Sequence, residues 1–177
     1  MTWTTFHHRG DVLRTVTQTA DDRRDGILPM DVEGVAETFG DELSLLGALQ
    51  LRWHTRLSGH IERELLQQPL DLDDAVIAAW HATAEELPGT RAILDHYRAE
   101  PRDEQMAFVT ATSEAKERVL LAAMAGRAGV DTAATATAGR ALEEEARQTW
   151  APTAPPVAAT DHRGLGLFGR IRAYVAA

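Results

Sequence analysis

The stretch from residue 41 to residue 67 constrains the fold most, because its apolar residues repeat with the period of one long α-helix. At about 100° per residue, the large apolar side chains fall on one broad face and the arginines fall on the other. Asp41 is a good cap for the start of this helix, and Pro69 follows its expected end. The apolar face comprises Leu43, Leu46, Trp53, Leu57, Ile61 and Leu65.

Helix signals follow one another along the rest of the first 150 residues. Further helices are expected over residues 11–24, 32–39, 72–86, 90–99, 102–126 and 130–149. Pro88 and Gly89 interrupt the chain between two of them. No segment has the sustained alternation of a strand. The sequence therefore predicts an all-α protein, a mainly antiparallel helical bundle of five to six helices that occupies residues 1–150.

The composition fits one globular domain that works without cysteine chemistry. The chain has 177 residues, of which 44% are hydrophobic and 25% charged, an ordinary balance for a folded protein. Because there is no cysteine, disulfides, cysteine-ligated zinc, iron–sulfur clusters and a cysteine nucleophile are excluded. The formal net charge of −9 disfavours binding to nucleic-acid phosphates.

Two further features bear on where the protein works. The start, MTWTTFHHRG, lacks the apolar run of a secretory signal, and no apolar run reaches the roughly 18 residues of a membrane span. We therefore expect a cytoplasmic protein, with a membrane disfavoured as partner. Lys116 is the only lysine and asparagine is absent, a bias that suggests a GC-rich bacterial genome.

Some polar residues of the long helix do not follow its amphipathic pattern. Gln50 and His54 lie inside the apolar face. Glu64 lies inside it too, and His60 lies near its edge. An unpaired buried polar group costs about 1–3 kcal/mol, so each needs a partner. Either these groups bind neighbouring helices, or they form a ligand site in which His60 and Glu64, at i and i+4, share a divalent metal ion.

A second i, i+4 pair, His81 and Glu85, is expected on the solvated side of the helix over 72–86, with an approach to the long helix if the two pack antiparallel. The run Glu143 to Glu145 is also expected on a solvated face. No Glu-x-x-His or hydrolase motif occurs. The glycines of GLGLFG (164–169) have the spacing of a dinucleotide-binding loop but are not set between a strand and a helix. No catalytic residue and no cofactor is therefore predicted, with a divalent metal as the alternative. The alternative ligand site comprises Gln50, His54, His60, Glu64, His81 and Glu85.

The composition changes after Trp150. Residues 151–161 contain three prolines and are typical of an extended linker. Residues 162–177 place apolar side chains at helical spacing beside three arginines, which predicts a short basic amphipathic helix. This terminal peptide can fold back on its own chain, dock on a partner protein or another copy, or touch a membrane surface. The predicted docking residues are Leu167, Phe168, Arg170, Ile171, Arg172 and Tyr174.

The segment LGLFGRIR (165–172), behind its Pro/Ala linker, resembles the targeting peptides of encapsulin cargo proteins. Those peptides combine small glycines with spaced aliphatic residues and a final basic residue, and this one departs by an apparent one-residue insertion. The resemblance implies docking for the peptide and nothing for the helical part. The leading hypothesis is a non-enzymatic protein that acts through protein–protein contacts or self-association. The alternative is a metal- or small-ligand-binding bundle, including an enzyme.

Overall fold

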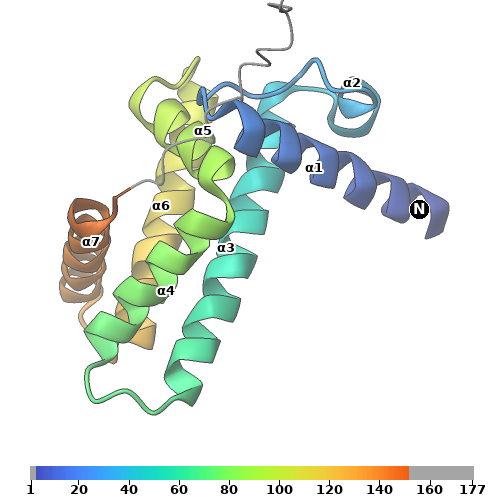
Figure 1. Cartoon of the computed structure of the whole chain (residues 1–177). Helices are drawn as coiled ribbons and strands as arrows, with labels where there is room; N and C mark the ends of the chain where they lie inside the picture. Colours follow the sequence, from blue (N-terminus) through green and yellow to red (C-terminus); the bar gives the residue numbers. More distant parts are fainter. Residues whose placement is uncertain (1–2, 152–177) are drawn as a thin grey trace, which may run out of the picture.

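The computed structural model describes residues 3–151, with side chains from residue 8 onward. The predicted linker after Ala151 and the terminal peptide lie outside the described residues. All regular secondary structure within residues 3–151 is helical, which confirms the all-α class. The helices are α1 (Trp3–Arg23), α2 (Val35–Phe39), α3 (Glu42–Leu66), α4 (Leu72–Glu86), α5 (Pro88–Ala99), α6 (Glu104–Met124) and α7 (Thr132–Thr149) (Figure 1).

The described residues hold seven helices, whereas the sequence predicted five to six. Pro88 is the reason for part of the difference, because it starts a new helix directly after α4. The short helix predicted over residues 32–39 is α2, which begins only at Val35. The first helix begins at Trp3 instead of residue 11, since Gly10 weakens a helix by only about 1 kcal/mol and does not end this one.

Aspartates start four of the helices in the way that the sequence indicates. Asp41, Asp71, Asp103 and Asp131 each accept a hydrogen bond from a backbone N–H of the first turn that follows. These caps satisfy donors that have no partner inside the helix. The starts of α3, α4, α6 and α7 are therefore set by local chemistry.

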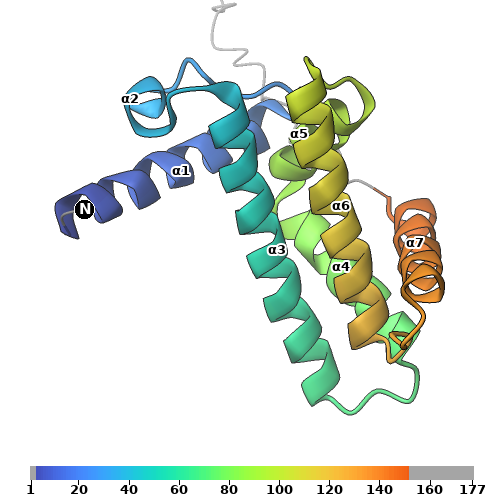
Figure 2. The ribbon, with the colours of Figure 1, turned by 180° about the vertical axis from the view of Figure 1, so that it is seen from behind.

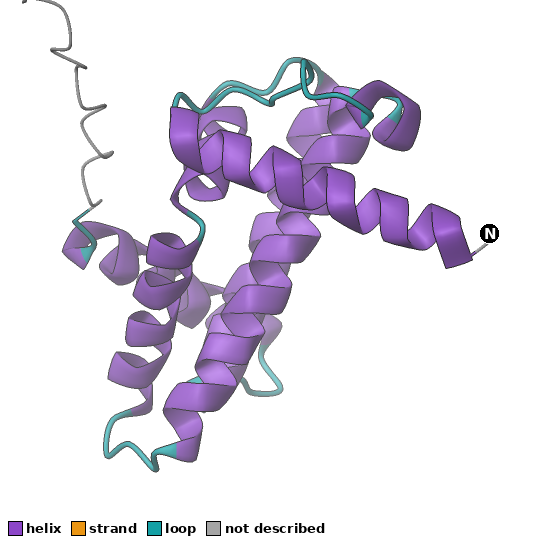
Figure 3. Ribbon diagram, turned by 45° about the vertical axis from the view of Figure 1, so that its right-hand side comes forward, coloured by secondary structure: helices purple, strands orange, loops and turns teal. Residues whose placement is uncertain are grey.

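The helices gather around α3, which contacts every other helix except α7. Helix α7 lies on α6 and α4, away from α3 (Figures 1 and 2). Helix α1 crosses the first half of α3, and the N-terminal part of α1 extends past α3 (Figure 3). This arrangement leaves one side of α6 uncovered and forms a groove between α1 and α3.

Two glycines let helices meet backbone to backbone. A Cβ atom added at Gly89 would lie 2.0 Å from the carbonyl carbon of Ala20, and one added at Gly139 would lie 2.0 Å from the carbonyl oxygen of Arg118. Real Cβ atoms do not approach so closely, so only glycine fits at either position. These contacts set the distances between α1 and α5 and between α6 and α7.

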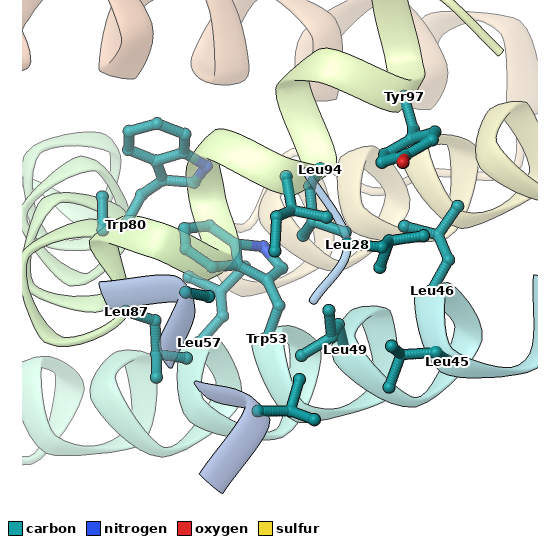
Figure 4. Packing of buried hydrophobic residues seen from close by; sticks show 14 of the residues in the cluster. Leu28, Leu45, Leu46, Leu49, Trp53, Leu57, Trp80, Leu87, Leu94 and Tyr97 are labelled. Carbon is teal, nitrogen blue, oxygen red and sulfur yellow. The ribbon is translucent and has the colours of Figure 1, made fainter. Parts of the chain in front are cut away.

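The core is built on α3. From its predicted apolar face, Leu46, Trp53, Leu57 and Ile61 are fully buried, while Leu43 and Leu65 are partly buried. The core also takes in residues from the other helices, among them Val16, Trp80, Leu87, Ile93, Tyr97 and Leu121. Figure 4 shows the indoles of α3 and α4 next to each other within this core. Among residues 3–151 no helix is long and apolar enough to cross a membrane.

Candidate functional site

A buried carboxylate, Glu117 of α6, lies between two tryptophans. Trp53 Nε1 of α3 donates to Glu117 Oε2 at 2.9 Å, and Trp80 Nε1 of α4 donates to Oε1 at 3.0 Å. The two indole rings meet edge to face, with their centres 5.6 Å apart. One carboxylate therefore connects three helices through neutral donors.

A guanidinium and an imidazole complete the surroundings of this carboxylate. The guanidinium carbon of Arg91 lies 4.6 Å from the ring centre of Trp53, in cation–π geometry, and the residue is only 3% exposed. His54 Nε2 lies 3.5 Å from Glu117 Oε2. We call this set the Glu117 cluster: Trp53, His54, Trp80, Arg91 and Glu117.

The electrostatics of the cluster keep Glu117 ionised. Burial by itself raises the pKa of the Glu117 carboxyl, but the hydrogen bond with His54, the nearby charge of Arg91 and the indole donor outweigh it. The net pKa is lower than usual. A carboxylate in this state cannot serve as a proton donor at neutral pH. A substrate could reach its oxygens only by displacing a tryptophan, so the cluster holds the fold together.

A second buried carboxylate, Glu143 of α7, is held by arginines. Arg98 Nη1 and Arg147 Nε donate to Glu143 Oε1 at 2.5 and 2.9 Å. Arg118 Nε donates to Oε2 at 2.6 Å. Burial favours the neutral acid, yet these three cations lower the pKa of Glu143 to about 2. We call these four residues the Glu143 cluster; it ties α7 to α5 and α6.

The structure gives His60 a different partner from the one that helical spacing suggested. His60 Nε2 lies 2.8 Å from Oε2 of Glu86 in α4, and Arg63 donates to His60 Nδ1 at 3.3 Å. With Nδ1 accepting, Nε2–H donates to Glu86. Glu64 is half-buried, and no hydrogen bond or ion pair within the described residues joins it to His60. Glu86 is thus the carboxylate that the sequence missed.

The remaining predicted site residues also form no bonds with one another. Gln50 is buried, and its side chain has no hydrogen bond among the described residues. His81 Nε2 donates to the carbonyl oxygen of Ala146 in α7 at 2.8 Å. Glu85 is exposed, and no hydrogen bond or ion pair within the described residues joins it to His81. Among the described residues, no hydrogen bond or ion pair joins any two of the six predicted ligand residues.

Few metal-ligating side chains lie close together in this arrangement. Among residues 3–151 no group of three or more His, Asp or Glu side chains is placed to hold a metal ion. Glu86, the neighbour of His60, also forms an ion pair with Arg56 at 3.2 Å. The metal pair His60 and Glu64 stays a prediction.

Sequence reasoning missed Glu117 and Glu143, although a signal for both exists. Glu117 shares helical spacing with buried Met106, Thr110 and Leu121 on α6. It therefore stands inside an apolar face, which is the criterion that singled out Gln50 and His54. The expectation of a solvated face at Glu143 is wrong, because Glu143 is buried on the same face of α7 as Gly139, Leu142 and Ala146. Glu144 and Glu145 are exposed.

Comparison of the chain with protein-family models, with curated proteins and with solved structures gives no match. The predicted docking residues of the terminal peptide, Leu167 to Tyr174, lie outside the described residues.

Proposed function

We propose that this protein acts through contacts with another protein or with a second copy of itself. In this proposal the helices form a mainly antiparallel bundle, the terminal peptide over 162–177 is a docking element, and the setting is the bacterial cytoplasm. The observation that carries the proposal is an uncovered apolar row along α6.

The row follows the outer side of α6. Phe108 is 72% exposed and Val119 is 50% exposed. Three exposed alanines, Ala111, Ala115 and Ala123, continue the same helical face. We call these five residues the α6 row. In Figure 2 no other described helix lies in front of α6. Single exposed apolar residues are ordinary, but a continuous row indicates a surface that another protein covers.

The buried charges of the helical part support the same conclusion. Glu117 and Glu143 accept hydrogen bonds from protein donors on both oxygens, so they are already used inside the fold. The terminal peptide has three arginines and no acidic residue, whereas the whole chain has a net charge of −9. An acidic protein surface, such as that of a second copy, complements such a peptide.

A metal- or small-ligand-binding site around His54, His60 and Glu64 is the alternative. It has less support, because His54 and His60 meet different carboxylates and the Glu64 side chain has no hydrogen bond or ion pair within residues 3–151. Metal-free protein whose melting temperature rises with added divalent ions would favour this alternative.

The test measures association of the full-length chain by light scattering over a range of concentrations and by capture of partner proteins. One variant combines Phe108→Ser with Val119→Ser, and another combines Phe168→Ser with Ile171→Ser. Leu70→Ser is the matched control, because Leu70 is fully exposed outside the α6 row. Each double variant should weaken association by about tenfold or more, as expected for contact residues at the centre of an interface. The control should associate like the wild type.

A thiol probe locates the contact directly. The chain has no cysteine, so Ala115→Cys in the α6 row and Ala136→Cys on α7 each introduce a single reactive group. Association should slow labelling at position 115 and leave position 136 unchanged. The proposal would be refuted if association changed the labelling rate at neither position and if both double variants associated like the wild type.

A further inference from the structure

A groove between α1 and α3 is lined by three arginines and by no carboxylate. Its volume is about 390 Å³, within the size range of small-molecule sites, roughly 300–1,000 Å³. The lining residues are Arg9, Leu13, Ala48, Leu51, Arg52, Thr55 and Arg56. The groove therefore combines positive charge with an apolar wall.

Arg52 is the residue in this groove with a buried donor that lacks a hydrogen-bond partner among the described residues. The donor is its Nε atom. Burial is the largest influence on the pKa of the Arg52 guanidinium and lowers it, and the neighbouring charge of Arg56 lowers it further. The carboxylates of Glu86 and Asp21 act in the opposite direction without restoring the usual pKa. A buried N–H without a partner costs about 1–3 kcal/mol.

The other two arginines of the groove, Arg9 and Arg56, each have a protein partner. Arg9 Nη1 donates to the carbonyl oxygen of Thr38 at 3.1 Å, and its guanidinium lies 4.4 Å above the centre of the Phe39 ring. Arg56 Nε forms an ion pair with Glu86 at 3.2 Å. Each guanidinium has several N–H donors, so these contacts orient Arg9 and Arg56 without using all of their donors.

We propose that this groove binds a small organic anion, a phosphate monoester with a short aliphatic group. The phosphate oxygens accept hydrogen bonds from the guanidinium groups of Arg9, Arg52 and Arg56. The Arg52 side chain turns on binding, so that its Nε–H, buried in the unliganded fold, also donates to the phosphate. Guanidinium groups fit phosphate oxygens well because their donors form a planar fork. The aliphatic group lies on the apolar wall of the groove. The site is independent of the proposed protein contacts, since the α6 row lies on another helix.

The test is calorimetric titration of the full-length protein with n-butyl phosphate, butyrate and inorganic phosphate as probes. Butyl phosphate should bind more tightly than inorganic phosphate, by roughly fourfold for each carbon that the groove buries. Arg52→Gln should weaken its binding by about tenfold or more. Arg140→Gln on α7 is the matched control, because Arg140 is exposed and outside the groove, and it should bind like the wild type.

A second readout keeps the test valid if Arg52→Gln folds poorly. The Nε–H signal of Arg52 in the nuclear magnetic resonance spectrum should shift and exchange more slowly with water when butyl phosphate binds. Butyrate that binds as tightly as butyl phosphate would support the anion site with a carboxylate in place of the phosphate. The inference is overturned if the Nε–H signal does not move, or if Arg52→Gln and Arg140→Gln bind butyl phosphate equally.

Discussion

The Glu117 cluster and the groove between α1 and α3 differ in whether their buried polar atoms have hydrogen-bond partners. Glu117 accepts one indole N–H on each oxygen and lies near Arg91. Arg52, on the other side of α3, has a buried Nε–H that no described group accepts. A buried charge with protein partners fixes the packing of helices, whereas a buried N–H without an acceptor weakens the fold. The difference separates the part of the molecule that holds the fold from the part that can bind something.

Helix α6 contributes one residue to each of the two carboxylate clusters. Glu117 and Arg118 are adjacent, so they point to different sides of the helix. Glu117 reaches α3 and α4, while Arg118 reaches Glu143 on α7. Substitutions of partnered and of unpartnered groups should therefore change the free energy of unfolding differently.

Replacing Glu117 with leucine should have the largest effect. The change leaves the N–H groups of Trp53 and Trp80 without acceptors and leaves Arg91 with less negative charge nearby. We expect the free energy of unfolding to fall by about 3–5 kcal/mol. Urea denaturation measures it, with Glu144→Leu as the control on an exposed position of α7. Equal loss in both variants would mean that the cluster does not hold the fold.

Acid should weaken the protein through the same carboxylates. The pKa of Glu143 falls from its usual 4.5 to about 2 on folding, so its contribution is complete above pH 4.5 and is lost as the pH drops toward 2. The full contribution is about 3 kcal/mol. Glu117, whose pKa is also lowered, acts in the same direction. Denaturation curves at several pH values should show this loss, and Glu143→Gln should reduce the dependence on pH.

Replacing Gly139 with alanine tests the close packing that brings α7 to the Glu143 cluster. The new methyl group would collide with the carbonyl oxygen of Arg118, so we expect a loss of about 1–3 kcal/mol. Gly59→Ala is the control, because no atom lies within 4 Å of the added Cβ there. On α3 this control should stabilise the helix by roughly 0.5–1 kcal/mol. Thermal unfolding measures both, and a loss in the control would contradict the reasoning.

Replacing Arg52 with methionine should have the smallest effect, and of the opposite sign. The variant removes an unpaired buried donor and keeps most of the side-chain volume. We expect unchanged stability or a gain of up to about 1 kcal/mol. Arg91→Met, which takes a paired cation out of the core, should instead lose about 3 kcal/mol. If the two variants lose the same stability, the contrast between partnered and unpartnered groups fails.

The sequence by itself determined the fold class and most helix ends. The helices predicted over 41–67 and 72–86 agree with α3 and α4 to within one residue at each end. Aspartate caps and proline act over a single turn, and the helical period is visible in the chain, so no tertiary information is needed. Burial of Gln50 followed from the same period. His54 and Glu64, placed on the same face, are only partly buried, whereas His60, placed near its edge, is buried. The terminal peptide stays a prediction.

Only the tertiary structure decided which groups meet. Helical spacing pairs residues within one helix, and it assigned Glu64 to His60. The carboxylate that His60 meets, Glu86, is 26 residues away on α4, and Trp53 is 64 residues from Glu117. The groove between α1 and α3 likewise needs Arg9 from α1 beside Arg52 from α3. Such contacts depend on how all the helices pack together, for instance on the backbone contact at Gly89, and no local pattern in the chain contains that information.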